Sequence, residues 1–383
     1  MGAQPMQSFR WFTSASLGLA LTLLAPALRA ESFLVYFGTF TDTTSTGIYV
    51  SRFDSATGKL TAPQLAAESD EASFLAVTPD HRFLYAVNEI NGDNGSVTAF
   101  QIDAKTGKLT QLNQQTSGGI RPCHLIVDRD DKFVVAANYL SGNVEVLPIQ
   151  ADGSLGAPVC LVQDHGSSIN AERQDGPHAH CLAMDASNRV YVCDLGADKV
   201  MIYHLDEKSG QLTTNDVPWA EIKPGSGPRH IAFRADGKYA YVISELASTM
   251  TAFACNPTNG ELTELQTLST LPEDFHGNNA SAEVAIPPSG KFLYASNRGY
   301  NSITVFTIDE KTGKLIRIQI EPVPGKTIRS FAIDPTGQFL IAAGQDSDNV
   351  VVFRINPKNG RLIATGEVLQ IGEPVCVTFV PTE

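Results

Sequence analysis

The stretch DSATGKL at residues 54–60 recurs, with small changes, along the whole chain. The copies are DAKTGKL at 103–109, DEKSGQL at 206–212, NPTNGEL at 256–262, DEKTGKL at 309–315, NPKNGRL at 356–362 and a shortened ADGSL at 151–155. Their glycines lie 46 to 57 residues apart. A repeat of that length with strand-like flanks indicates a β-propeller, in which each repeat forms one blade.

A second series of turns lies between the first. Its clearest members are TPDHRF at 78–83, RADGKY at 234–239, PPSGKF at 287–292 and DPTGQF at 334–339, with weaker members at 128–133 and 184–190. Apolar runs such as 74–77 and 83–87 flank these turns. Because Gly, Pro and Asp between two short apolar runs indicate a hairpin, each repeat is predicted to form four antiparallel strands, A to D.

The two ends of the chain supply the A and B strands of the seventh blade. There are seven C–D turns but six A–B turns, while FLVYF at 33–37 resembles a B strand and VCVTF at 375–379 an A strand. If the two ends share a blade, the ring closes without exposed sheet edges. We therefore predict an all-β, seven-bladed β-propeller of four-stranded antiparallel blades.

Residues 1–30 differ from the rest of the chain. Arg10 precedes the apolar run 11–24, and ALRA at 27–30 has small residues at the spacing of a cleavage site. This pattern predicts a secretory signal peptide cut before Glu31, and hence a periplasmic or secreted protein. The alternative is an uncleaved membrane anchor, which Thr13, Ser14 and Ser16 disfavour. Residues 31–383 are predicted to form one propeller domain, because the repeat is unbroken.

Composition narrows the class of partner. The chain has 383 residues, 43% of them hydrophobic and 18% charged, and a formal charge of −13. Removing residues 1–30 takes away two arginines and no acids, which leaves −15. Such a charge argues against nucleic acid and anionic membranes as partners. Nothing indicates an oligomerising segment, so we expect a monomer.

The six cysteines show no metal-ligand spacing, and most lie in predicted strands. We expect buried thiols. Cys181 and Cys193 should lie roughly opposite each other across one hairpin, and a disulfide there is the alternative.

Strand topology predicts where a site would form. In an antiparallel blade the start of strand A and the end of strand B lie at the same mouth of the central channel. The residues that start the A strands are Phe74, His124, His180, His230, Glu283, Ser330 and Cys376. Those just past the B strands are Thr39, Glu89, Tyr139, Leu195, Glu245, Arg298 and Gln345. Arg229 and Arg329 directly precede two of the A strands.

The longest D–A connections, at 156–179, 213–229 and 263–282, lead into His180, His230 and Glu283. Long loops on a rigid scaffold often carry function, so we expect them to wall the mouth. The predicted catalytic residues are His180, Arg229, Glu245 and Arg298. Substrate contacts are predicted at His124, Asn138, Glu89, His230 and Glu283.

Several segments at these positions resemble one family. They are YFGTFTD at 36–42, PHAH at 177–180, DLGAD at 194–198, GSGPRH at 225–230 and ASNRG at 295–299. The chain resembles, over residues 33–380, the seven-bladed lactonase family of propeller-type 6-phosphogluconolactonases and fungal carboxy-muconate lactonizing enzymes. The resemblance implies a site without metal or cofactor, built from His180, Glu245, Arg229 and Arg298.

Hydrolysis of a lactone, a cyclic carboxylic ester, needs a base for water and a cation near the developing oxyanion. We assign Glu245 or His180 as the base, Arg229 to polarise the carbonyl, and Arg298 to hold an anionic group of a sugar (phospho)lactone.

Three alternatives to this hydrolase remain open. One is a lactonizing isomerase of the muconate type. Another is a metal-dependent, gluconolactonase-like propeller that uses Asp175, His178, His180 or Glu283 as ligands. The third is a non-catalytic ligand-binding propeller at the cell surface.

Overall fold

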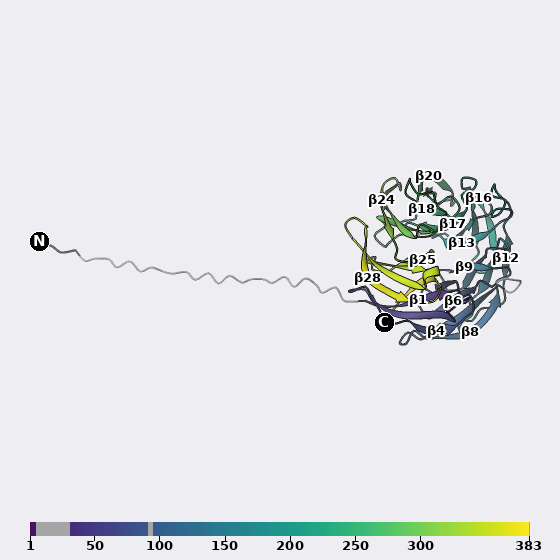
Figure 1. Ribbon diagram of the computed structural model, residues 1–383, viewed down its shortest axis with the longest axis horizontal. Helices are drawn as coiled ribbons and strands as arrows, with labels where there is room; N and C mark the ends of the chain where they lie inside the picture. Colours follow the sequence, from purple (N-terminus) through teal and green to yellow (C-terminus); the bar gives the residue numbers. More distant parts are fainter. Residues whose placement is uncertain (5–30, 91–94, 383) are drawn as a thin grey trace.

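A computed structural model describes residues 1–4, 31–90 and 95–382, so nearly all of the predicted signal peptide lies outside the described residues. Seven antiparallel sheets are arranged around a central axis (Figure 1). Among the described residues, no helix is long and apolar enough to cross a membrane. The all-β, seven-bladed prediction is confirmed.

The two chain ends share blade 1, as predicted. It consists of β29 (Pro374–Pro381), β1 (Ser32–Thr39) and β2 (Gly47–Asp54), followed by two short strands, β3 (Lys59–Leu60) and β4 (Gln64–Glu68), which both pair with β2. β1 and β29 are antiparallel, with Val35 opposite Phe379 and Phe37 opposite Val377. The ring is therefore closed by main-chain hydrogen bonds between the first and last strands.

The other six blades each contain four consecutive strands. Blades 2 and 3 are β5 (Phe74–Val77), β6 (Phe83–Asn88), β7 (Ser96–Ile102), β8 (Leu109–Thr116), β9 (Pro122–Val127), β10 (Phe133–Asn138), β11 (Asn143–Pro148) and β12 (Cys160–Gln163). Blades 4 and 5 are β13 (Ala179–Met184), β14 (Arg189–Asp194), β15 (Lys199–Leu205), β16 (Leu212–Glu221), β17 (Pro228–Phe233), β18 (Tyr239–Ser244), β19 (Thr249–Cys255) and β20 (Leu262–Ser269). Blades 6 and 7 are β21 (Ala280–Ala285), β22 (Phe292–Arg298), β23 (Ser302–Ile308), β24 (Leu315–Pro322), β25 (Ile328–Ile333), β26 (Phe339–Gly344), β27 (Asn349–Ile355) and β28 (Leu362–Gln370), with a 3₁₀ turn at Gln345–Ser347.

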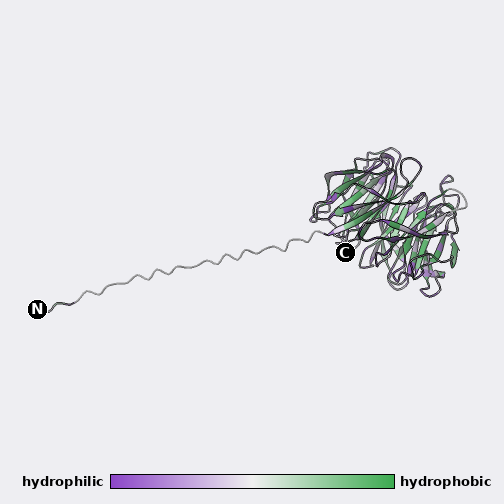
Figure 2. Ribbon diagram, turned by 90° about the horizontal axis from the view of Figure 1, so that it is seen from below, coloured by the Kyte–Doolittle hydropathy of each residue, from purple (hydrophilic) through white to green (hydrophobic). Residues whose placement is uncertain are grey.

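The innermost strand of each blade lines the channel. β29, β5, β9, β13, β17, β21 and β25 each contact the next in order, and the last contacts the first. The fourth strands, such as β8, β12 and β16, lie at the rim (Figure 1). Apolar residues concentrate on the strands (Figure 2) and pack as seven clusters, one between each pair of neighbouring blades.

The repeated C–D turn is held by the neighbouring blade. Its glycine has φ between +68° and +85° in all seven copies, a conformation that favours glycine. In five copies a buried tyrosine hydroxyl of the preceding blade donates a hydrogen bond to that glycine's carbonyl oxygen, at 2.7 to 3.1 Å. The turn motif therefore serves the packing between blades, which explains why it recurs.

One predicted site residue lies one position away from its expected column. His124 lies opposite Ala137 and His230 opposite Ile243, but in blade 4 it is Cys181 that lies opposite Cys193. His180 is unpaired between Ala179 and Cys181. The prediction that His180 shares a column with His124 and His230 is therefore wrong. The same bulge occurs in β9 and β17, but the A–B turn of blade 4, at 185–189, is one residue shorter than the turn at 234–239 of blade 5, so counting back from strand B gives a position one residue too early.

His180 instead occupies the bulge position that Arg229 has in β17 and Arg329 in β25. Bulges often re-aim side chains next to functional sites, and here they supply one imidazole and two guanidinium groups.

The predicted long connections are shorter than expected in two cases. β16 extends to Glu221 and β20 to Ser269, so much of 213–229 and 263–282 is strand. The connection at 164–178, between β12 and β13, is the long one that reaches over the mouth, since its Arg173 contacts Glu245.

Candidate functional site

A buried carboxylate with three arginines forms one corner of the mouth. Arg229 Nε donates to Glu245 Oε2 at 3.1 Å, and Arg298 Nη2 donates to the same oxygen at 2.6 Å. Arg173 Nη2 donates to Glu245 Oε1 at 2.8 Å and to the Tyr139 hydroxyl at 2.9 Å. We call Glu245 with Arg173, Arg229 and Arg298 the Glu245 corner. The structure thus brings three of the four predicted catalytic residues into direct contact.

The charges of this corner decide what Glu245 can do. Burial alone would raise its pKa, but the charges of Arg298 and Arg229 and the hydrogen bond from Arg173 lower it to about 2. Glu245 is therefore ionised at neutral pH, and both of its oxygens already accept hydrogen bonds. A carboxylate of that kind holds arginines well and accepts a proton poorly.

Arg229 lies deepest, with a side chain only 2% exposed. Its Nη1 donates to the carbonyl oxygen of Ala282 at 2.8 Å. Burial and the charge of Arg298 lower its pKa to about 9, which still leaves the guanidinium charged at neutral pH.

His180, the fourth predicted catalytic residue, is buried beside this corner. Its ring centre lies 5.5 Å from that of Tyr139 and 5.3 Å from that of His230. Burial and the charge of Arg229 lower its pKa well below the usual value, so the imidazole is neutral. Among the described residues, Nδ1 of His180 is buried with no hydrogen-bond partner.

His230 and Glu283 form a hydrogen-bonded pair. His230 Nδ1 lies 2.8 Å from Glu283 Oε1, which also accepts from the Val284 amide at 2.9 Å. Burial raises the pKa of Glu283 to about 7, against the opposing charge of Arg229, and burial lowers the pKa of His230 well below its usual value. The structure therefore favours a pair of neutral groups with His230 Nδ1–H as the donor.

His124 lies deeper in the channel. Its ring centre is 3.9 Å from that of Phe74, and its Nδ1 accepts from the Leu182 amide at 3.3 Å. Nε2 lies 3.5 Å from Cys181 Sγ. Within the described part of the chain, His124, Cys181 and His230 are the one His/Cys/Asp/Glu group with donor atoms close enough to hold a metal. Because Nδ1 of His124 accepts a hydrogen bond, its Nε2 carries the proton, which favours hydrogen-bonded packing over metal coordination.

The predicted alternative metal ligands are not brought together. Asp175 is exposed and lies 3.8 Å from His178, whose ring stacks on Tyr139. His180 lies beside Tyr139 and His230, and Glu283 pairs with His230. Cys181 and Cys193 are opposite each other as predicted, but both thiols are free, so the alternative of a disulfide is not adopted.

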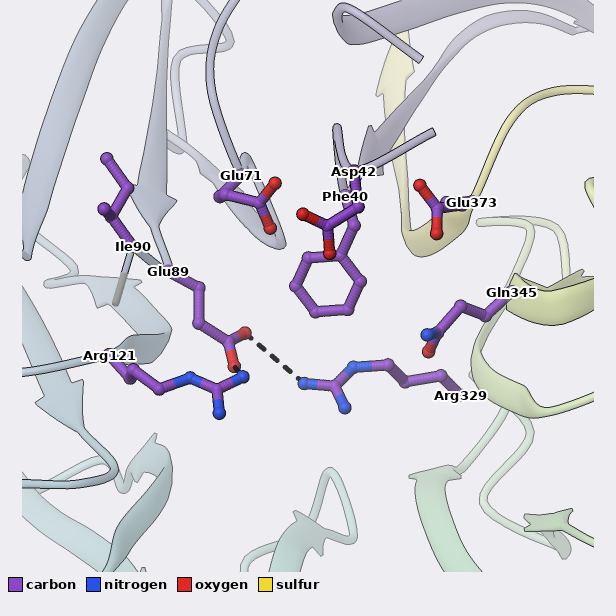
Figure 3. A pocket seen from close by; sticks show the side chains of 9 residues that line it. All are labelled: Phe40, Asp42, Glu71, Glu89, Ile90, Arg121, Arg329, Gln345 and Glu373. Carbon is purple, nitrogen blue, oxygen red and sulfur yellow. Dashed lines mark hydrogen bonds and ion pairs between the residues drawn. The ribbon is translucent and has the colours of Figure 1, made fainter. Parts of the chain in front are cut away.

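The two remaining residues predicted to contact substrate, Asn138 and Glu89, have different surroundings. Asn138 is fully buried and donates to Ser117 O at 2.6 Å and to Asn143 Oδ1 at 2.8 Å, so it holds the turn after β10, which does not favour a ligand contact. Glu89 lies across the mouth from the Glu245 corner. It accepts from Arg121 at 3.0 Å and from Arg329 at 3.4 Å, and it lines a cavity (Figure 3).

Three arginines of the mouth are absent from the predicted site. Arg329 is one of the residues predicted to precede an A strand at the mouth, although it was not among the predicted contacts, and Arg121 lies two residues before the corresponding position Cys123. Their positive charge is the signal in the sequence that could have identified them. Arg173 lies within the connection predicted to wall the mouth, but its reach to Glu245 depends on the folded path of that loop, which no spacing reveals.

The fold and the mouth together define a class of protein: a closed seven-bladed propeller with a polar, arginine-rich site at one end of its channel. A family model described as "Lactonase, 7-bladed beta-propeller" matches residues 34–379. The chain belongs to this family of seven-bladed β-propeller lactonases.

Named relatives agree with the family. The chain is 39% identical to the 6-phosphogluconolactonase of Bacillus subtilis (strain 168) over 300 residues, 78% of this chain and 84% of the relative. It is 36% identical to the 6-phosphogluconolactonase of Formosa agariphila over 307 residues, 78% and 85% of the two chains. The solved periplasmic gluconolactonase of Pseudomonas aeruginosa superposes with a TM-score of 0.87 at 32% identity, covering 92% of this chain and all of that one.

Proposed function

We propose that this protein hydrolyses a sugar lactone, a carboxylic ester hydrolase reaction, at the mouth that contains the Glu245 corner. The observation that carries the proposal is the contact of Glu245 with Arg229 and Arg298 beside a neutral, unpartnered His180. The family supports it, as do relatives named for 6-phosphogluconolactone and gluconolactone hydrolysis.

Of the two candidate bases, we propose His180. Glu245, with a pKa of about 2 and three arginine donors, is a poor proton acceptor. His180 is neutral, and its Nδ1, unlike the two oxygens of Glu245, has no hydrogen-bond partner among the described residues and so remains available as a proton acceptor. Glu245 then acts as a positioning residue that fixes the guanidinium groups of Arg229 and Arg298.

The reaction follows from these roles. Water attacks the lactone carbonyl carbon as its proton passes to His180. N–H groups of Arg298 and Arg229 that Glu245 does not occupy stabilise the tetrahedral oxyanion. The ring C–O bond then breaks, and the proton on His180 passes to the leaving alkoxide. The product is the open-chain hydroxy acid, with no net change in the enzyme.

The test is pH-stat hydrolysis of glucono-δ-lactone and 6-phosphogluconolactone, with and without EDTA. His180→Gln should lower kcat by about 10²–10⁴-fold, the usual contribution of a positioned general base. The matched control is His204→Gln, at an exposed position of β15, which should behave like wild type. Wild-type kcat in the His180→Gln variant would refute the assignment of the base.

Loss of activity in EDTA would point to the metal-dependent alternative. Turnover of a muconate, followed by its ultraviolet absorbance, in a protein without lactone hydrolysis would favour the isomerase.

We further infer that the mature chain begins at Glu31 and acts in the periplasm or outside the cell. The basic, apolar and small-residue regions within residues 1–30 support this, and the Pseudomonas aeruginosa relative is named as periplasmic. The intact mass of protein recovered from a periplasmic extract should correspond to a start at Glu31. A mass that includes Met1 would contradict the inference.

A further inference from the structure

A second corner of the same mouth encloses a cavity of about 490 Å³. Its lining residues are Phe40, Asp42, Glu71, Glu89, Ile90, Arg121, Arg329, Gln345 and Glu373 (Figure 3). Arg329 is the bulged residue near the start of strand A in blade 7, and the others follow B strands or precede A strands in blades 1, 2, 3 and 7, which places them at the same end of the channel as Glu245. We call this space the Glu89 cavity. Its volume lies in the usual range for small-molecule sites.

Arg329 has more free donors than the arginines of the Glu245 corner. Among the described residues its guanidinium donates a single hydrogen bond, from Nη2 to Glu89 Oε2 at 3.4 Å. The guanidinium carbon also lies 5.2 Å from the centre of the Phe40 ring. Arg229 and Arg298, by contrast, each donate to Glu245 and to a backbone carbonyl. A guanidinium that faces a cavity with most of its donors unused is prepared for a ligand.

Arg329 also lies at the same level of the channel as the proposed base, because it has the bulge position in β25 that His180 has in β13. Its charge lowers the pKa values of both His180 and His230, in addition to the larger effects of burial and Arg229. Because both side chains start from the same level of the mouth, a ligand held by Arg329 can extend from the Glu89 cavity toward the Glu245 corner.

The cavity carries more acid than base. Four carboxylates, of Asp42, Glu71, Glu89 and Glu373, face two guanidinium groups, which gives a formal charge of −2. In Figure 3 the carboxylates of Asp42, Glu71 and Glu373 lie along one side and Arg121 and Arg329 along the other. Carboxylates and guanidinium groups together bind sugar hydroxyls, which both donate and accept. A phosphate ester, with a charge of −1.5 to −2 at pH 7, would be repelled.

The backbone holds these side chains in place. Glu71, Arg121 and Glu373 occupy equivalent positions before their A strands, and all three have left-handed φ values of 43° to 55°. Glu71 Oε1 accepts from the Thr41 amide at 3.0 Å, and Glu373 Oε2 accepts from the Thr43 amide at 3.1 Å. Strained backbone of this kind is retained where surrounding structure requires it, often at ligand sites.

We propose that Arg329 is a specificity-determining residue and that the Glu89 cavity binds the exocyclic hydroxymethyl end of an uncharged aldonolactone, discriminating against a phosphate ester at that end. This proposal rests on the proposed lactone hydrolysis at the Glu245 corner. It differs from the expectation of an anionic substrate, because the acids of the cavity outnumber its arginines.

Two stable products, D-gluconate and 6-phosphogluconate, differ only by the phosphate and so isolate its effect. Calorimetric titration of the full mature chain should give a Kd for 6-phosphogluconate that is at least about tenfold higher than the Kd for D-gluconate. This ratio is equivalent to about 1.4 kcal/mol of binding free energy. In the double variant Glu71→Gln, Glu373→Gln the Kd for 6-phosphogluconate should fall about tenfold, while the Kd for gluconate should stay nearly unchanged. The control, exposed Glu310→Gln, should change neither.

Arg329→Met should weaken gluconate binding and raise KM for glucono-δ-lactone at least about tenfold while kcat changes little. Arg329→Lys should restore only part of the loss, because the ammonium lacks the planar fork. Circular dichroism of each variant verifies the fold.

Tighter or equal binding of 6-phosphogluconate by the wild-type protein, wild-type behaviour of Arg329→Met, or no binding of either probe would overturn the proposal. Failure of the proposed function looks different. In that case lactones are not hydrolysed, but gluconate still binds in an Arg329-dependent way.

Discussion

Replacing Glu245 with glutamine should destabilise the protein in a way that depends on pH. The carboxylate is nearly buried, and Arg173, Arg229 and Arg298 all donate to it. Glutamine keeps the size of the side chain and one acceptor oxygen but removes the negative charge. Three guanidinium groups are then left facing each other without a counterion, two of them in largely buried positions.

The lowered pKa of Glu245 gives the size of this pH-dependent loss of stability. Its folded-state value of about 2 lies below the ordinary 4.5, so the ionised group stabilises the fold at every pH above 4.5. By linkage this amounts to about 3 kcal/mol at pH 7, falling to about 1 kcal/mol at pH 3 and vanishing below pH 2. The deficit of Glu245→Gln relative to wild type should shrink by the same amount as the pH falls.

Equilibrium urea denaturation of both proteins at pH 7 and pH 3 measures this. The matched control is Glu172→Gln, an exposed position on the loop that carries Arg173, for which we expect a change near zero at both pH values. If Glu245→Gln is equally destabilising at pH 7 and pH 3, or not destabilising at all, the arginine cluster does not hold Glu245 ionised and the reasoning about the corner is wrong.

Two further predictions concern the channel and the repeated turn. The pKa of Glu283 is raised to about 7, so the folded state binds the extra proton between pH 4.5 and 7 and the stability supplied by this carboxyl falls as pH rises through that window. Glu283→Gln keeps an acceptor for His230. Between pH 4.5 and pH 8 its free energy of unfolding should therefore rise by about 3 kcal/mol relative to that of the wild type. If urea denaturation gives the same difference between the two proteins at both pH values, His230 and Glu283 are not a neutral pair. Gly313→Ala should cost clearly more stability than Gly237→Ala, because both have a φ of +68° but only at Gly313 would the new Cβ lie 2.2 Å from the Tyr239 ring. Gly237→Ala should cost about 1 kcal/mol, and equal losses of melting temperature would refute the role of blade packing in the turn.

The sequence alone was sufficient for the architecture. Turn motifs such as 54–60 and 309–315 are local, and their spacing sets the number of blades without any knowledge of packing. The pairing of the two chain ends followed from counting strands, because an unpaired strand edge is unfavourable. The same counting placed Glu245, Arg229 and Arg298 at one mouth, since antiparallel topology determines which strand ends meet.

Tertiary structure determined the contacts within that mouth. The shorter A–B turn of blade 4 places Cys181, and not His180, in the column of His124 and His230. His180 is the bulged residue of β13, and the pairing register that decides this is not encoded in a periodic pattern. The path of the 164–178 connection brought Arg173 onto Glu245, a contact that turns a candidate base into an anchor for arginines. The local sequence pattern thus determined where charged groups gather, while burial and contacts between distant segments determined their hydrogen-bond partners and the directions of their pKa shifts.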